Sequence, residues 1–279
     1  MAIRELGGGA RRRLVSRSDD TANTFLARLP FEGLQKWLVP IGLVLVWQAA
    51  CVFGFVSETV LPRPTTVLKT AWDMTLTGEL PAGMAVSFLR AIAGFAVGGG
   101  IGFAFGLANG MSSLSNRLSD TTLQMLRNVP HLAMIPLVIL WFGIGEGAKL
   151  FLVALGVFFP VYLNTLHGIR SVDPLLIEMG KSYGMNTRTL FFRVIFPSAL
   201  PSIFVGIRFG LGIMWLTLIV AETIAAQSGL GYMAMQAREF MQTDIVVMAI
   251  VIYALLGKLA DSIATFSERL CMPWRREVQ

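Results

Sequence analysis

The sequence predicts an all-α integral membrane protein with about six transmembrane helices and a cytoplasmic loop that contains short coupling helices. Composition is the first of three observations behind this prediction: 54% of the 279 residues are hydrophobic, 14% are charged, and the mean hydropathy is +0.66. A soluble domain normally carries about 25% charged residues, and so few charges could not cover a large aqueous core. The other two observations are apolar stretches of about 20 residues and basic residues that gather between them.

Six apolar stretches qualify, or nearly qualify, as transmembrane helices, for which about 20 residues are needed. They are residues 37–56, 85–108, 123–142, 150–166, 203–221 and 245–264. The polar leader before the first stretch is too long for a cleaved signal peptide, so we expect this stretch to be retained as an anchor. Together the stretches define a six-helix domain at 37–265, between a basic N-terminal tail at 1–36 and a C-terminal tail at 266–279.

Glycines recur at short intervals in the second stretch and again in the fifth. In the second stretch Gly94, Gly98, Gly102 and Gly106 follow one another at a spacing of four, and the fifth stretch contains Gly206, Gly210 and Gly212. A spacing of about four residues puts small residues on one helix face, which lets helices pack closely in lipid. We therefore expect the backbones of these two helices to lie in close contact with the backbones of neighbouring helices.

The third stretch contains two prolines, Pro130 and Pro136. A proline inside a helix removes a hydrogen bond and kinks the helix. Such a break is tolerated better where the helix is buried in protein or lines a water-filled cavity than where it faces lipid. The stretch is therefore a candidate wall of a translocation path, with Pro130 and His131 as candidate path residues. For His131, simple packing is the alternative to a role in proton transfer.

The basic residues predict the orientation in the membrane. With the N-terminus inside, the tails and inner loops hold 15 of the 23 basic residues and the outer loops hold 4. Basic residues favour the cytoplasmic side, so both termini are predicted to be cytoplasmic. The remaining four, Arg90, Arg127, Arg208 and Lys258, lie within or at the ends of helices.

Several function classes find no support in the sequence. The formal net charge of +6 would suit nucleic acid, but the basic residues lie in tails and inner loops, which argues against a nucleic-acid partner. The two cysteines and two histidines form no cluster, so we expect no metal site. No phosphate-binding loop of the GxxxxGKS or GxxxxGKT type occurs. No paired carboxylates or Ser/His dyad at workable spacing support an intramembrane enzyme.

The long inner loop at 168–200 carries the most informative pattern. Asp173 followed by Pro174 predicts a helix start, because the carboxylate accepts free N–H groups and proline suits the first helical position. Gly184 suits the helix end. This predicts a helix of about 10 residues, roughly 15 Å long.

A second short helix is expected directly after Gly184. Asn186 or Thr187 would cap its start, and Pro197 and Pro201 would end it before the fifth stretch. Two short helices on the inner face can dock into a groove of a soluble partner. Such a contact is mechanical and needs no catalytic residue.

This loop resembles the cytoplasmic motif of permease subunits in binding-protein-dependent ABC importers. That motif is Glu-Ala-Ala, three residues, Gly, nine residues, then aliphatic, any residue, aliphatic and Pro. Here every spacing is met by Glu178, Met179, Gly180, Gly184, Val194, Phe196 and Pro197. The departures from the motif, at Met179, Gly180 and Phe196, keep its apolar or small character. The segments 124–131, 135–144 and 229–240 also look like the sulfonate, taurine and nitrate branch, and most like its aliphatic sulfonate permeases.

The resemblance, which covers nearly the whole chain beyond the N-terminal tail, implies a multi-pass protein of the bacterial inner membrane. Two copies form a pore in the lipid, two cytoplasmic ABC ATPase subunits bind the inner loops, and a periplasmic binding protein delivers a small anionic solute. ATP and Mg are used by the ATPase, and this chain holds no cofactor. An aliphatic sulfonate is the expected solute. Taurine, nitrate or a vitamin precursor is the alternative, and a non-transporting scaffold is a further one.

Two sets of candidate site residues follow, one from the resemblance and one largely from the high cost of charge in apolar segments. The ATPase-coupling residues are Asp173, Pro174, Glu178, Met179, Gly180, Lys181, Tyr183, Gly184 and Pro197. The translocation-path residues are Arg90, Pro130, His131, Arg208 and Glu222. Three alternatives remain: Glu178 and Lys181 form a solvated pair, both arginines reach water at helix ends, and Glu222 makes a hydrogen bond between helices.

Overall fold

A computed structural model describes residues 32–274, and every regular element in that part of the chain is helical. These residues fall into two units, 32–56 and 57–274. The first unit contains α2 (Glu32–Val52), whose apolar part is Trp37–Val52. The predicted N-terminal tail lies outside the described residues up to residue 31, and its last residues form the start of α2.

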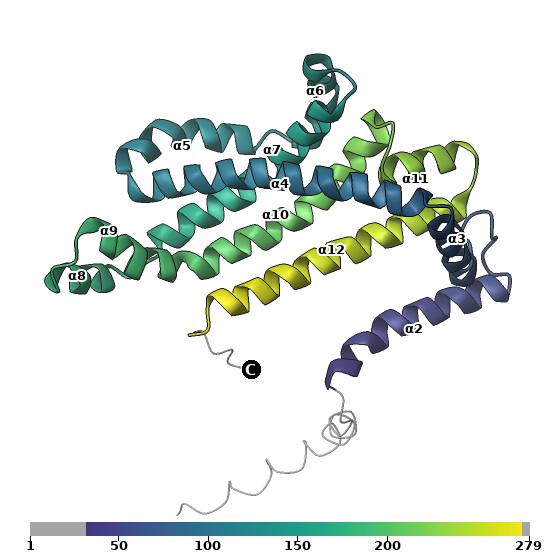
Figure 1. Ribbon diagram of the computed structural model, residues 1–279, viewed down its shortest axis with the longest axis horizontal. Coiled ribbons are helices and arrows are strands. Elements are labelled where there is room, and N and C mark those ends of the chain that lie inside the picture. Colours follow the sequence, from purple (N-terminus) through teal and green to yellow (C-terminus); the bar gives the residue numbers. More distant parts are fainter. Residues whose placement is uncertain (1–31, 275–279) are drawn as a thin grey trace, which may run out of the picture. The chain divides into compact units, whose positions relative to one another are not determined.

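The second unit is built from long apolar helices. Within the described residues, four helices are long and apolar enough to cross a membrane. They are α4 (Glu79–Met111), α7 (Glu146–Arg170), a helix at Thr187–Ile224 that contains all of α10 (Phe196–Ala225) except its last residue, and α12 (Thr243–Cys271). Each extends beyond the stretch predicted for it. Figure 1 shows α4, α7 and α10 running alongside one another, with α12 beside α10.

The third predicted stretch is not one kinked helix. It is divided between α5 (Ser113–Arg127), a 3-10 turn at His131–Met134 and α6 (Ile135–Phe142), and the two halves are bent by 79°. The chain breaks because Pro130 is extended, at φ −64° and ψ 107°, and cannot continue the ladder of α5. With this bent pair taken as one span, the described residues hold up to five spans; the number six stays a prediction.

The second short helix of the inner loop does not end where the prolines predicted. From α9 (Thr187–Leu190) the chain continues through a wide π turn at Phe191–Ile195 directly into α10. In this turn the backbone N–H of Phe196 donates to the carbonyl of Phe191, which makes room for Pro197 in the first turn of α10. Pro201 lies inside α10, and packed neighbours allow such a proline in a membrane helix. The prediction that Pro197 and Pro201 end this helix is therefore wrong.

The glycines of α4 lie against α7, as their spacing predicted. A Cβ atom at Gly94, Gly98, Gly102 or Gly106 would come within 3 Å of α7, closer than real side chains lie. At Gly98 the obstacle is the backbone of Ala154 itself. The prediction holds in part for α10, where Gly206 and Gly210 are packed but Gly212 faces open space.

Four shorter helices lie at the two ends of this unit. α8 (Pro174–Ser182) and α9 lie at one end, close to the end where α4 turns into α5, and α3 (Pro64–Leu76) and α11 (Leu230–Glu239) lie at the other (Figure 1). The sequence did not predict α3 or α11, because neither is long or apolar enough to be read as a span. The predicted inner loops, which contain α8 and α9 and the turn between α4 and α5, thus lie at one end of the unit, and the predicted outer loops, which contain α3 and α11, lie at the other.

The α4–α7 packing predicts opposite effects for two neighbouring glycines. Gly98→Ala should lower the stability by about 1–3 kcal/mol, because the added methyl group forces two backbones apart. Gly100→Ala meets nothing within 4 Å and should be neutral or slightly stabilising, since alanine favours a helix over glycine by roughly 0.5–1 kcal/mol. Thermal unfolding of both variants in detergent tests this; equal midpoints would contradict the packing.

Candidate functional site

The helix α8 begins and ends where the sequence predicted. The backbone N–H of Leu175 donates to Asp173 Oδ1 at 2.9 Å, and Pro174 occupies the first turn. At the other end Gly184 has φ +74°, the left-handed conformation that glycine adopts without strain. Its N–H donates to Lys181 O at 2.9 Å and the N–H of Met185 donates to Gly180 O at 3.1 Å, which is the Schellman arrangement.

One face of α8 is apolar and exposed. Leu175, Met179 and Tyr183 are 70%, 50% and 78% exposed and follow one another at a spacing of four residues, so they share one side of the helix. A neighbouring side of the helix contains Gly180, which is buried and lies so close to Leu190 of α9 that a Cβ atom would collide with it. An exposed apolar stripe on a short capped helix suits docking into a groove of a partner protein.

Three further predicted coupling residues lie on α8 or at the start of α10. Glu178 and Lys181 are both exposed on α8, and no ion pair joins these two described side chains. Pro197 is half-buried at the start of α10. The geometry leaves Glu178 and Lys181 free to meet a partner, and their role in coupling stays a prediction.

A buried ion pair joins two of the predicted path residues, Arg90 and Glu222. Arg90 Nη1 donates to Glu222 Oε1 at 2.7 Å, and the two residues are 5% and 1% exposed. Arg90 also donates from Nε and Nη2 to the two oxygens of Glu146, both at 2.6 Å, and to the backbone carbonyl of Ser228 at 2.6 Å. Arg90 therefore does not extend to water; it is held between carboxylates, as a charge in an apolar segment requires.

Glu222 receives further hydrogen bonds from three other parts of the chain. Ser87 Oγ donates to Oε2 at 2.7 Å, Tyr253 OH at 2.8 Å, and the backbone N–H of Gly231 at 2.9 Å. These donors lie on α4, α12 and α11, so the carboxylate on α10 links four helices. The expectation of a hydrogen bond between helices is confirmed for Glu222, whereas Ser87, Glu146, Ser228 and Tyr253 were missed. Their positions are scattered along the chain, and only the apolar context of Arg90 and Glu222 signalled that partners must exist.

The other path residues have separate partners. Arg208 Nε donates to Asp261 Oδ1 at 2.9 Å on an exposed side of α10. His131 Nε2 lies 3.1 Å from Thr217 Oγ1, also on α10, and Pro130 forms the break after α5. The structure thus unites Arg90 with Glu222 and leaves Arg208 and His131 elsewhere. Their roles in a translocation path stay predictions.

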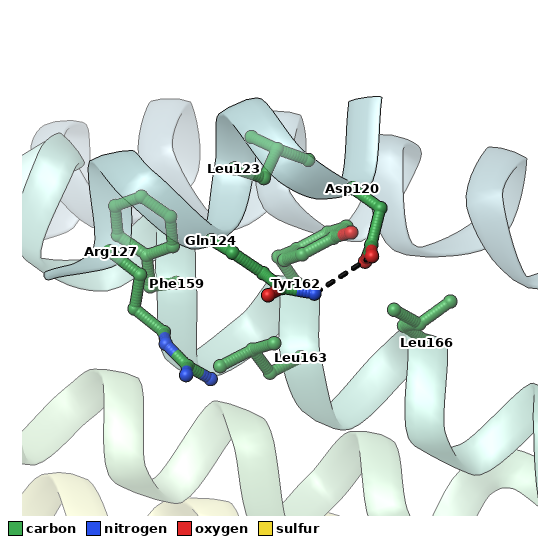
Figure 2. Close-up of a pocket in the computed structure, with 8 residues that line it drawn as sticks. All are labelled: Asp120, Leu123, Gln124, Arg127, Phe159, Tyr162, Leu163 and Leu166. Carbon is green, nitrogen blue, oxygen red and sulfur yellow. Dashed lines mark hydrogen bonds between the residues drawn. The ribbon is translucent and has the colours of Figure 1, made fainter. Parts of the chain in front are cut away.

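A pocket of about 230 Å³ lies between α5 and α7. Figure 2 shows polar groups from α5 on one side and mostly apolar side chains of α7 on the other. The lining residues are Asp120, Leu123, Gln124, Arg127, Phe159, Tyr162, Leu163 and Leu166. The sequence did not predict this pocket, because its polar side falls on a helix whose boundaries were misjudged.

Long apolar helices, a buried ion pair between two of them and an exposed capped helix at one end are typical of an integral membrane protein that meets a partner at that end. The chain belongs to the family described as the inner membrane component of binding-protein-dependent transport systems, which matches residues 96–271. The family predicted from the loop at 168–200 is therefore confirmed.

Curated relatives and a solved structure agree with this membership. SsuC of Escherichia coli (strain K12), a permease named for aliphatic sulfonate transport, is 58% identical over 238 residues, covering 85% of this chain and 90% of that protein. The taurine transport system permease TauC of the same organism is 35% identical over 246 residues, covering 85% and 88%. The structure of an amino acid ABC transporter with histidines has a TM-score of 0.56 at 18% identity, covers 71% of this chain and 97% of that chain, and supports the fold alone.

The buried pair and the exposed pair predict different costs for losing an arginine. Arg90→Ala should destabilise the protein by about 3–5 kcal/mol, because it leaves Glu222 buried without its counter-charge. Arg208→Ala, which breaks the exposed contact with Asp261, should cost about 0–1 kcal/mol. Thermal unfolding in detergent measures both. A loss for Arg90→Ala no larger than that for Arg208→Ala would show that the buried cluster does not stabilise the helices.

Proposed function

We propose that two copies of this chain form the translocation path of an ABC importer that moves an aliphatic sulfonate into the cytoplasm. The observation that carries this proposal is the capped helix α8, whose exposed apolar face lies at one end of a bundle of membrane helices. A cytoplasmic ATPase dimer is the partner proposed for this face. The solute is inferred from the relatives, since the identity with the sulfonate permease, 58%, exceeds that with the taurine permease, 35%.

The path of force from the ATPase follows from the chain's continuity. ATP and Mg bind the partner subunits, and closure of the ATPase dimer moves α8. Because Gly180 packs on Leu190, α9 moves with it. α9 and α10 belong to one helix, Thr187–Ile224, of 38 residues, which at 1.5 Å per residue spans about 57 Å. Displacement at the inner face is thereby passed to the outer end of the bundle, which is the basis of alternating access.

The proposed orientation places α8 and both termini in the cytoplasm. The 15 basic residues assigned to tails and inner loops, against 4 in outer loops, support it. The end that carries α3 and α11 then faces the periplasm, where a solute-binding protein would dock. That protein captures the solute first, so taurine, nitrate or a vitamin precursor remains the alternative solute class.

The coupling role predicts that strain at Gly184 separates ATP hydrolysis from transport. Gly184→Val should abolish most solute uptake, because a β-branched residue does not tolerate φ near +74° and the end of α8 is displaced. Gly184→Asn should retain more uptake, since asparagine adopts this conformation more readily. Uptake and ATPase activity are measured in proteoliposomes with the complete complex. Uptake at the unaltered level in Gly184→Val, with equal amounts in the membrane, would contradict the coupling role.

The solute class is tested with the complete importer and its binding protein. Alkanesulfonates should stimulate ATP hydrolysis and enter proteoliposomes, and taurine and nitrate should do so less well at equal concentration. Calorimetry of the binding protein with the same compounds gives an independent ranking. Stimulation by nitrate or taurine alone would contradict the proposed solute and leave the family assignment intact.

A further inference from the structure

Four basic residues lie within or at the ends of the apolar stretches predicted from the sequence, and three of them have carboxylate partners. Arg90 contacts Glu222 and Glu146, whereas Arg208 and Lys258 share Asp261. The fourth, Arg127, has no ion pair with any residue in the part of the chain that the structure describes. A charge inside a membrane is costly and generally faces a partner, a cavity or water, so Arg127 requires an explanation.

Arg127 lies on a helix and not in a loop, and its side chain is exposed, as α5 has no buried residue. It is the last residue of α5, which starts at Ser113, directly after the turn from α4. Fourteen residues of helix place it about 21 Å from that turn, a distance shorter than a hydrocarbon core of about 30 Å. In Figure 1, α5 runs back alongside α4 from this turn. The helix then breaks at Pro130, so Arg127 stands at the point where the chain leaves the direction of α5.

The polar face of α5 is directed at the pocket. Asp120, Gln124 and Arg127 are spaced four and three residues apart, share one helix face, and all line the pocket (Figure 2). Gln124 Nε2 donates to Asp120 Oδ2 at 2.7 Å, so the carboxylate is already occupied by a donor. Arg127 lies two helical turns from Asp120, at the opposite end of the row, and among the described residues its guanidinium has no protein acceptor.

The opposite wall of the pocket is mostly apolar. It is formed by Phe159, Leu163 and Leu166 of α7, with Tyr162 between them. A volume of about 230 Å³ is below the range of roughly 300–1,000 Å³ typical of drug-sized ligands. The pocket therefore suits a small molecule that has one anionic end and a short hydrocarbon part.

We propose that Arg127 binds the anionic head of the solute within the pocket between α5 and α7, while Phe159, Leu163 and Leu166 contact its carbon chain. A guanidinium group offers a planar fork of donors to oxyanions and is less strongly hydrated than an ammonium group. The inference deepens the proposed import of organosulfonates and rests on it. The same oxyanion chemistry could come from a lipid phosphate, and the experiment separates these two sources.

The test uses the complete importer with its binding protein in proteoliposomes. Arg127→Gln should lower kcat/KM for alkanesulfonate uptake about tenfold or more, as the loss of a charge-assisted hydrogen bond predicts, and Arg127→Lys should recover part of it. Arg117→Gln is the matched control: Arg117 is an exposed arginine of the same helix that does not line the pocket, so uptake should be unchanged. Radiolabelled ethanesulfonate should also bind the permease–ATPase complex without binding protein, and Arg127→Gln should abolish this binding.

The outcomes distinguish failure of the proposed Arg127 site from failure of the proposed sulfonate import. Unchanged kcat/KM and unchanged ethanesulfonate binding in Arg127→Gln, beside active wild type, overturn the site alone. If wild type moves no sulfonate, the proposed solute and this site both fall. If removal of anionic lipid from the vesicles reproduces the effect of Arg127→Gln in wild type, Arg127 binds a lipid phosphate, and the solute site is likewise overturned.

Discussion

The close approach of α4 to α7 is the constraint on which the rest of the structure depends. Lipid gives helices no hydrophobic reason to associate, so close van der Waals packing must hold them together. The row from Gly94 to Gly106 provides this packing, because each glycine removes the side chain that would separate the two backbones. α7 in turn packs on α10, so a single pair of helices sets the position of the helix that continues from the inner loop. The pocket beside Arg127 has α7 as its second wall and depends on the same pair.

The packing of these helices brings the buried charges together. With α4, α10 and α12 in place, Arg90 and Glu222 lie in contact and out of water, where an unpaired charge would cost several kcal/mol. Ser87, Tyr253 and the N–H of Gly231 occupy the remaining acceptor positions of Glu222. The pair therefore fixes α10 near the end that carries α11, while the opposite end of the same helix continues into α9. One helix is thus fastened at one end and exposed to a partner at the other.

Local chemistry was predictable from the sequence and long-range pairing was not. Asp173, Pro174 and Gly184 set the limits of α8 through hydrogen bonds that reach only a few residues, and the spacing of the α4 glycines needed no knowledge of the partner helix. The partners of Arg90 are 56 and 132 residues away, and periodicity carries no information on such distances. The prolines show the same limit: Pro130 breaks the chain and Pro197 does not, because a π turn that no local pattern announced accommodates the second.

The contrast between two arginines indicates where a solute can be bound. Arg90 already directs its donors at two carboxylates and a carbonyl, so a passing anion would have to displace one of them and leave a buried charge unpaired. That exchange is unfavourable at every step of a transport cycle, which makes the Arg90 cluster a device that holds helices together. A transport site needs the opposite property, a cation whose described surroundings do not satisfy it and which lies beside open volume. Among the basic residues of the apolar segments, Arg127 combines these two features, and this separates its role from that of a structural ion pair.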